Sequence, residues 1–256
     1  MAEFLRVACL QTDIIWKNIS ANLHKYDLML DRLNSSDVIV LPEMFCTGFV
    51  ADPKTHYRDQ DRVISWLQNT AVSTNNLVIA SHPYSDGENY FNRLFCCFPD
   101  RNIEYYDKRH LFAFGAEGEE YSRGKQRKLV EYKNWKLLPL ICYDLRFPVW
   151  SRNAENYHAL IYIANWPAGR KNVWKILLQA RAIENQSYVL GVNRTGTDGN
   201  RIRYHGESML VSPLGKIVNR LDRAEQILEI EISKEEIGLV RKNFPFLKDR
   251  DDFSLT

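Results

Sequence analysis

Short apolar runs of strand character alternate with amphipathic helical patterns along this chain. Residues 4–10, 38–42 and 77–80 are apolar runs of the length that is typical of buried strands. Residues 18–33 and 62–75 carry apolar side chains at spacings of three and four, which predicts helices that pack on one face. Because such alternation places helices against sheets, it assigns the chain to the α/β class.

Later segments continue this alternation and add hairpins. Further strands are expected over residues 90–98, 102–107, 135–142, 159–164, 188–193, 205–211, 216–219 and 226–232. A helix is expected over 171–186, and another after the capping residue Ser233, whereas 246–256 are expected to be extended. Apolar strands need cover on both faces, so we expect two sheets packed together between two helix layers. No linker interrupts residues 1–256, which predicts a single domain.

Charge and cysteine content narrow the classes of partner and compartment. The formal net charge is +2, which argues against a dedicated nucleic-acid-binding protein. No apolar stretch approaches the roughly 20 residues of a membrane-spanning helix, so no membrane partner is expected. The five cysteines form no C-x-x-C pair, which favours neither a disulfide framework nor a zinc site. We therefore expect a cytoplasmic protein in which at least one thiol has a role other than cross-linking.

A cysteine ends one of the apolar strands. Residues 138–148 read LPLICYDLRFP, so Cys142 closes a buried run and Asp144 and Arg146 follow at once. Pro148 is expected to open a helix, which would place the thiol at a bend between strand and helix. Backbone N–H groups at such a bend favour a thiolate and can hold an oxyanion. The alternative is a buried cysteine with a purely structural role.

Two other strand ends carry charged residues that could assist a thiol nucleophile. Glu43 follows the strand at 38–42, where it is either an exposed loop residue or a desolvated base. Lys108 is either part of a solvated charge cluster or a fixed cation that steadies negative charge on a carbonyl oxygen. The EGEE segment at 117–120 is expected to be a surface turn. Together these residues indicate acyl transfer through a thioester.

Three motifs in fixed order resemble the carbon–nitrogen hydrolase, or nitrilase, superfamily. They are VIVLPE at 38–43, YDKRHLF at 106–112 and LICYDLRFP at 140–148. Three further segments resemble the bacterial omega-amidase branch of that superfamily. They are PVWSRN at 148–153, ANWP at 164–167 and RAIENQ at 181–186. The resemblance extends over nearly the whole chain.

This resemblance implies a four-layer α-β-β-α sandwich, a homodimer, and neither a metal nor an organic cofactor. It implies that Cys142 is the nucleophile, Glu43 the general base and acid, and Lys108 the stabiliser of the oxyanion. The backbone N–H of Tyr143 is expected to share the oxyanion. A second family glutamate fits best at Glu117. The neighbouring residues Glu119 and Glu120 remain alternatives for that position.

The omega-amidase branch implies hydrolysis of small 2-oxo acid amides such as 2-oxoglutaramate and 2-oxosuccinamate. Their carboxylate needs a cation or a nest of hydrogen-bond donors, and Arg146, Arg170 and Lys171 are the candidate cations. Phe49 and Trp166 are expected to wall the small pocket, although both could equally be ordinary core aromatics.

Several other functions are compatible with the same residues. Another amidase, a nitrilase or a carbamoyl-amide hydrolase would use the same three groups on a different substrate. A non-catalytic scaffold would keep Cys142 only for packing. A Cys–His hydrolase would instead require His110 or His205 as its base.

Overall fold

The computed structural model describes residues 3–115 and 117–253. One sheet contains β1 (Phe4–Gln11), β2 (Val38–Val40), β3 (Leu77–Ser85), β4 (Tyr90–Cys97), β5 (Ile103–Asp107) and β14 (Gln226–Ser233). The other contains β6 (Val130–Tyr132), β7 (Trp135–Ile141), β8 (Ala159–Ala164), β9 (Tyr188–Asn193), β12 (Met209–Val211) and β13 (Ile217–Arg220). Their spatial orders are β14-β1-β2-β3-β4-β5 and β13-β12-β9-β8-β7-β6.

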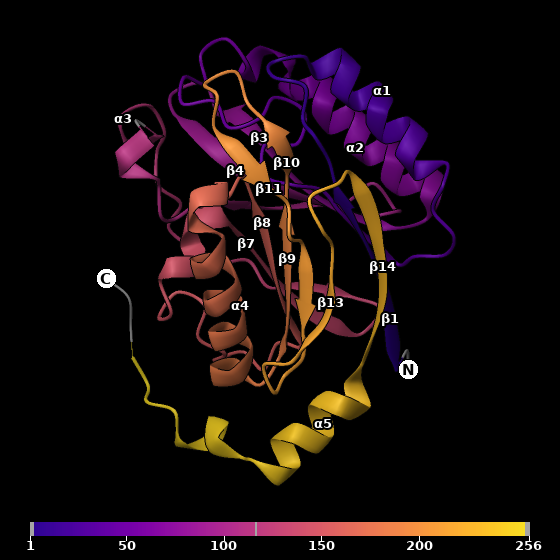
Figure 1. The fold of residues 1–256 in the computed structure, drawn as a ribbon, viewed down its shortest axis with the longest axis vertical. Coiled ribbons are helices and arrows are strands. Elements are labelled where there is room, and N and C mark those ends of the chain that lie inside the picture. Colours follow the sequence, from indigo (N-terminus) through magenta and orange to yellow (C-terminus); the bar gives the residue numbers. More distant parts are fainter. Residues whose placement is uncertain (1–2, 116, 254–256) are drawn as a thin grey trace.

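Helices cover the outer face of each sheet (Figure 1). The helices α1 (Ile19–Leu30) and α2 (Gln60–Thr74) pack on the first sheet, and α4 (Lys171–Asn185) packs on the second. The short α3 (Glu117–Glu120) and the C-terminal α5 (Lys234–Asn243) lie outside these layers. This is the expected four-layer α-β-β-α sandwich, so the predicted fold class is confirmed.

Buried apolar side chains form two main cores between the layers. The larger core fills the space between the sheets and reaches α4, and it includes Leu94, Cys96 and Trp174. The smaller core lies between the first sheet and the pair α1 and α2, with Tyr26 and Leu67 at its centre. Both sheets are thus buried on both faces, as the apolar strand sequences require.

Strand direction brings several strand ends to one end of the sandwich. In the first sheet β1, β2 and β3 are parallel, and in the second β7, β8 and β9 are parallel. Two successive antiparallel pairings, β3 with β4 and β4 with β5, return β5 to the direction of β3. The residues that follow β2, β5, β7 and β8 therefore lie at neighbouring strand ends.

Three local expectations differ from the structure. Residues 205–211 form two strands, β11 (Arg203–His205), which pairs with β10 (Thr195–Thr197), and β12, because Gly206 and Glu207 adopt positive φ angles. A 3₁₀ turn, η3 (Cys142–Arg146), begins at the cysteine, whereas Pro148 lies in a later turn.

The extended tail is the third difference. Residues Phe246–Asp249 form a 3₁₀ turn, η5, and residues 254–256 lie outside the described residues. Other short 3₁₀ turns are η1 (Tyr57–Asp59), η2 (Ala113–Gly115) and η4 (Ala168–Arg170). The expected cap of the last helix is confirmed, since the Ser233 hydroxyl accepts a hydrogen bond from the backbone N–H of Glu235.

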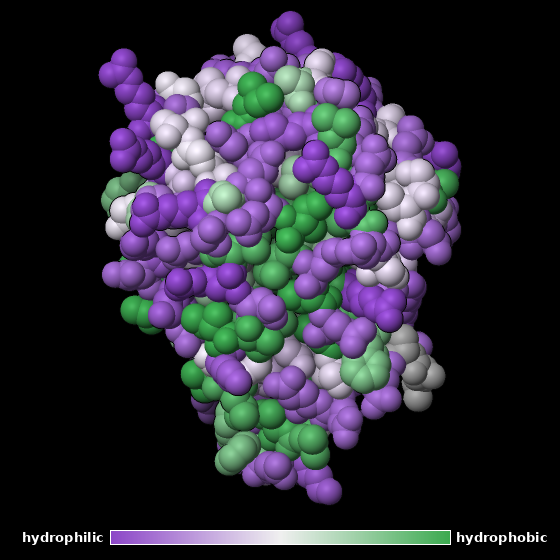
Figure 2. Space-filling model, turned by 45° about the vertical axis from the view of Figure 1, so that its right-hand side comes forward, coloured by the Kyte–Doolittle hydropathy of each residue, from purple (hydrophilic) through white to green (hydrophobic). Residues whose placement is uncertain are grey.

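The surface is mostly hydrophilic on the face that Figure 2 presents. Hydrophobic residues gather in a band through the middle of that face, with hydrophilic residues on either side. Within residues 3–115 and 117–253, no helix is both long and apolar enough to cross a membrane.

Candidate active site

Glu43, Lys108 and Cys142 meet at the strand ends described above. Glu43 follows β2, Lys108 follows β5, and Cys142 follows β7 as the first residue of η3. All three line one cavity of about 550 Å³. This volume lies within the range of small-molecule binding sites. The tertiary fold thus brings together three side chains that are far apart in the sequence.

Glu43 is fully buried, so the alternative of an exposed loop residue is wrong. Its Oε1 accepts hydrogen bonds from Lys108 Nζ at 2.8 Å and from Asn92 Nδ2 at 2.9 Å. Its Oε2 accepts one from the backbone N–H of Asn165 at 2.9 Å. The carboxylate is therefore held in one orientation beside the cavity, where it can exchange a proton with a bound group.

Lys108 is also buried, and it is not part of a solvated charge cluster. Its Nζ lies between two carboxylates, 2.8 Å from Glu43 Oε1 and 3.0 Å from each oxygen of Glu117. Burial lowers the pKa of Lys108, but the charges of Glu117 and Glu43 outweigh this and leave its pKa above the ordinary value. The ammonium group therefore stays protonated and supplies a fixed positive charge.

Glu117 opens α3 and is fully buried, so the surface turn expected at 117–120 is wrong for this residue. Besides Lys108, it accepts hydrogen bonds from Asn92 Nδ2 at 3.0 Å and from the backbone N–H of Phe112 at 2.7 Å. Burial raises its pKa, against the lowering effect of Lys108. By contrast Glu119 is exposed, and Glu120 pairs with Lys54 at the surface.

Cys142 has a backbone φ of +40°, in the left-handed region that side chains disfavour. Such strain costs roughly 1–3 kcal/mol and is characteristic of functional sites. The bend turns the residue out of β7, and its side chain borders the cavity.

The surroundings of the Cys142 thiol oppose its ionisation, although N–H groups at a strand-to-helix bend favour it. Burial and the charge of Glu43 raise its pKa well above the ordinary value, more than Lys108 lowers it. The physical reason is that a thiolate here would be desolvated and would face two carboxylates. Such a thiol needs a base when it reacts, and Glu43, whose charge acts on the thiol, is a candidate for this base.

Tyr143 is the second residue of η3, and it also borders the cavity. The first N–H groups of a helical turn have no partner within that turn. The Tyr143 N–H can therefore donate to an oxyanion beside Cys142. Lys108 can do the same, because the two oxygens of Glu117 can share one of its three N–H groups.

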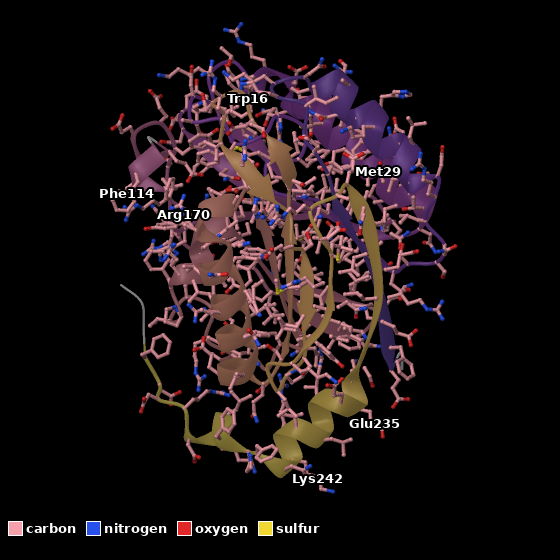
Figure 3. All side chains as sticks on the ribbon, viewed as in Figure 1. Trp16, Met29, Phe114, Arg170, Glu235 and Lys242 are labelled. Atoms are coloured by element: carbon pink, nitrogen blue, oxygen red, sulfur yellow. The ribbon has the colours of Figure 1, made fainter. Side chains whose placement is uncertain are left out.

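Of the five candidates for substrate contact, Arg146, Arg170, Phe49 and Trp166 line the cavity, whereas Lys171 is not among the described residues that line it. The guanidinium of Arg146 lies 5.2 Å from the ring centre of Trp166, and that of Arg170 lies 5.0 Å from Phe112. Phe49 lies beneath Lys108 Nζ at 5.6 Å. In Figure 3 Arg170 and Phe114 lie near the same end of the molecule, next to α3 and the start of α4.

The sequence reasoning missed two asparagines that organise the site. Asn92 bridges Glu43 and Glu117 through its Nδ2, and Asn165 contacts Glu43 through both its backbone and its side chain. A signal for Asn92 existed, because it alternates with Leu94 and Cys96, which face the other sheet. A polar residue on an inward-facing strand position indicates a buried partner.

Twelve further residues complete the walls of the cavity, and of these only Phe112 and Pro167 lie in motifs that the sequence analysis identified. These residues are Trp16, Lys17, Val50, Ala51, Asp52, Phe112, Phe114, Pro167, Asp198, Asn200, Ile202 and Tyr204. The Trp16 ring is packed so closely against Gly48 and Gly199 that a Cβ at either position would lie within 3 Å of it.

Neither candidate histidine base is among the described residues that line the cavity. His110 Nδ1 bonds to Asp144 Oδ1 at 2.8 Å, and His205 is on the β11 strand. No group of three or more histidine, cysteine, aspartate or glutamate side chains is placed to hold a metal ion within the described ranges 3–115 and 117–253.

Comparison with known proteins agrees with the fold and identifies the family. Residues 6–242 match the carbon–nitrogen hydrolase family, and the chain belongs to this family. The family inferred from the three motifs is therefore confirmed.

Individual relatives lie in the omega-amidase branch. The chain is 42% identical to the omega-amidase YafV of Yersinia enterocolitica, over 98% of each chain. It is 32% identical to the 2-oxoglutaramate amidase of Bacillus subtilis, over 95% of this chain and 96% of that one. A solved CN-hydrolase superfamily protein from Xanthomonas campestris superposes with a TM-score of 0.93 at 35% identity, covering 99% of both chains. That protein carries an arsenic adduct in its active site.

Proposed function

We propose that this protein is an omega-amidase. It hydrolyses the terminal amide of small 2-oxo acid amides, such as 2-oxoglutaramate and 2-oxosuccinamate, to the 2-oxo dicarboxylate and ammonia. The observation that carries the proposal is the buried cluster of Glu43, Lys108 and Glu117 beside the Cys142 thiol. Similarity to relatives named omega-amidase and 2-oxoglutaramate amidase supports this substrate class.

The first half of the reaction forms a thioester and releases ammonia. Glu43 takes the proton of the Cys142 thiol as the sulfur attacks the amide carbon. Lys108 Nζ and the Tyr143 N–H donate to the oxyanion that develops on the carbonyl oxygen. Glu43 then gives its proton to the amide nitrogen, because an unprotonated amine is a poor leaving group. The C–N bond breaks and ammonia departs.

The second half of the reaction hydrolyses the thioester. A water molecule enters the position that ammonia has left, and Glu43 removes one of its protons. The resulting hydroxide attacks the acyl carbon, and the same two donors hold the new oxyanion. Collapse breaks the C–S bond, releases the carboxylate product and returns a proton to the sulfur. Glu117 keeps Lys108 oriented throughout, through two contacts of 3.0 Å.

Two arginines are placed to bind the carboxylate of the substrate. Arg146 and Arg170 border the cavity against aromatic rings, and neither forms an ion pair with any residue in 3–115 or 117–253. A guanidinium without a carboxylate partner in a mostly apolar cavity is suited to bind a carboxylate of a ligand. We therefore assign substrate binding to Arg146 and Arg170, with Phe49 and Trp166 as walls.

We also propose that residues 1–256 form one catalytic domain, which the match over residues 6–242 supports. A homodimer is proposed as well. Two exposed isoleucines, Ile176 and Ile183, lie seven residues apart on one face of α4 and offer an apolar surface to a second copy. A cytoplasmic location is proposed because all five cysteines are free thiols.

The decisive experiment measures ammonia release from 2-oxoglutaramate by the wild-type protein and by Cys142→Ala. We expect release by the wild type and none by the variant. The matched control is Cys97→Ala, which removes a buried thiol from the core near α1 and α2, so it should retain activity. Equal release by wild type and Cys142→Ala would contradict the thioester mechanism.

Arg146→Gln and Arg170→Gln test the substrate class within the same assay. Each should raise KM for 2-oxoglutaramate while leaving hydrolysis of an uncharged short amide, such as butyramide, unchanged. The folded wild type could fail to hydrolyse 2-oxoglutaramate and yet hydrolyse nitriles, carbamoyl amides or other short amides. That result would support the catalytic residues and contradict the proposed substrate class.

A further inference from the structure

One buried carboxylate joins the segment that carries Lys108 to the segment that carries Cys142. Asp144 lies in η3 and is fully buried. Its Oδ2 accepts hydrogen bonds from the backbone N–H of Ile141 at 3.0 Å and from the Tyr106 hydroxyl at 2.8 Å. Ile141 immediately precedes Cys142, and Tyr106 is two residues before Lys108. Asp144 thereby connects strand ends of two different sheets.

The other carboxylate oxygen makes the same connection. Asp144 Oδ1 accepts from the backbone N–H of His110 at 3.1 Å and contacts His110 Nδ1 at 2.8 Å. An ionised carboxylate only accepts hydrogen bonds, so Nδ1 is the protonated ring nitrogen. The imidazole is stacked on Phe147, with ring centres 3.7 Å apart and planes within 8°. These contacts hold His110, which follows Lys108 by two residues, as Tyr106 precedes it by two.

The Tyr106 hydroxyl completes this arrangement. It donates to Asp144, and it accepts from the backbone N–H of Arg109 and from Trp150 Nε1, each at 3.0 Å. The turn that holds Lys108 is therefore bonded to the same network on both sides. Neither Asp144 nor Tyr106 is among the described residues that line the cavity, so these groups act through Lys108 and Cys142 and not on the substrate.

We propose that Asp144, together with Tyr106 and His110, is a positioning group that sets the spacing between the Cys142 thiol and the Lys108 ammonium. The inference rests on the proposed function, in which these two groups act on the same carbonyl. Cys142 needs such support because its backbone has a φ of +40°. Asp144 accepts a hydrogen bond from Ile141, the residue before Cys142. Its bond to Tyr106 at the end of β5 keeps the bend at Cys142 at a fixed distance from Lys108.

The test is a double-mutant cycle on turnover with Tyr106→Phe, Asp144→Asn and the double variant. Displacement of a catalytic group by about 1 Å can cost ~100-fold in rate, so we expect each single variant to lose ~10- to 100-fold in kcat. KM should stay within about twofold, because no substrate contact is lost. The double variant should lose little more than the worse single variant, since both act through one network.

Tyr105→Phe is the matched control. It removes a hydroxyl from the neighbouring, half-exposed tyrosine of the same strand and should leave kcat unchanged. At His110, Asn offers an amide N–H near the former Nδ1 position, whereas Leu does not. Both variants lose the stacked ring, so a kcat for His110→Asn well above that of His110→Leu identifies the hydrogen bond as the cause.

A purely structural role predicts a different result. In that case Tyr106→Phe and Asp144→Asn lower the unfolding midpoint, but kcat per folded molecule matches that of Tyr105→Phe. That result would overturn the proposal.

A second readout is independent of the amide substrate. The burst of 4-nitrophenolate from 4-nitrophenyl acetate reports acylation of Cys142, and Cys142→Ala should abolish it. If the wild type does not hydrolyse 2-oxoglutaramate, the proposed function is wrong. The double-mutant cycle can still be measured on the rate of the 4-nitrophenolate burst. An undiminished burst rate in the variants would then contradict the positioning role on its own.

Discussion

The resting charge of the Cys142 thiol follows from its surroundings and not from its place at a strand end. A helical turn starting at a cysteine stabilises a thiolate, but here burial and Glu43 act in the opposite direction and prevail. In the proposed mechanism Glu43 therefore takes the thiol proton during the reaction.

The first prediction concerns the reactivity of this thiol. Alkylation of Cys142 by iodoacetamide should be slower at pH 7 than that of glutathione, and its rate should still rise above pH 9, because the pKa of the thiol is raised. Mass spectrometry of the labelled peptide measures the rate, and Cys142→Ala gives the background from the other four cysteines. A rate that levels off below pH 8 would show a lowered pKa instead.

A second prediction concerns the cation between two carboxylates. Lys108→Met leaves Glu43 and Glu117 buried without a counter-charge, which should lower the free energy of unfolding by ~3–5 kcal/mol near neutral pH. Removing the cation also removes the effect that lowers the pKa of Glu117, so burial raises the folded-state pKa of Glu117 further above its unfolded value. The stability of the variant should therefore be greater at pH 5 than at pH 8, and fall as pH rises through the folded pKa values.

Urea unfolding of wild type and Lys108→Met at pH 5 and pH 8 checks the magnitude and the sign. The matched control is Lys54→Met, which breaks the exposed pair with Glu120 and should change stability little. A loss for Lys108→Met that is no larger than for Lys54→Met would contradict the buried cluster.

At the scale of elements, the end of β5 is fixed by a close backbone approach. Gly124 donates its N–H to the Lys108 carbonyl at 2.9 Å, and a Cβ on Gly124 would lie 1.8 Å from the Asp107 carbonyl oxygen. No side chain fits without moving one of the two segments. The loop after α3 thus fixes the position of the Lys108 backbone at the end of β5.

We predict that Gly124→Ala lowers stability by ~1–3 kcal/mol through overpacking and lowers kcat by more than ~10-fold through displacement of Lys108. Thermal unfolding and ammonia release measure the two effects. Gly238→Ala is the control, because Gly238 is exposed in α5 with open space around its Cα. That variant should gain ~0.5–1 kcal/mol and keep full activity. Unchanged kcat in Gly124→Ala would refute the role of this contact.

Most elements could be predicted because their apolar periodicity is strong. The strands at 159–164 and 188–193 and the helix that begins at Lys171 agree with the sequence to within a residue. The start of the helical turn after β7 was misplaced because Pro148 gives a helix-start signal, whereas the actual turn begins at Cys142 and is capped by the Asp144 carboxylate. That bond depends on a buried side chain, which local propensity does not reveal.

At the scale of the whole molecule, α4 leaves an apolar surface uncovered. Ile176 and Ile183 are 62% and 49% exposed, and Leu214 lies on the adjoining turn, where Ile183 packs over Gly215. Contiguous exposed apolar residues of this kind mark association surfaces. A symmetric pairing through this face would bury them in both copies.

We predict that the wild type sediments as a dimer and that Ile176→Glu combined with Ile183→Glu shifts it to a monomer. Charges placed in an apolar interface are desolvated without a partner, which opposes association. Analytical ultracentrifugation at micromolar concentration measures the change. Leu28→Glu is the control, since Leu28 is 49% exposed on α1 at the opposite side of the sandwich (Figure 1). Equal dissociation by this control would contradict the α4 interface.

The amino-acid sequence by itself determined the layered α/β fold, the family and the three charged or thiol groups at strand ends. These are local properties, because periodicity and short motifs depend on neighbouring residues only. The tertiary structure alone decided that Glu117, and not Glu119 or Glu120, contacts Lys108, and that Asn92 joins the two carboxylates. It also decided that burial and the charge of Glu43 raise the pKa of the Cys142 thiol. Burial and the distance between charges from different strands exist only once the two sheets have packed together.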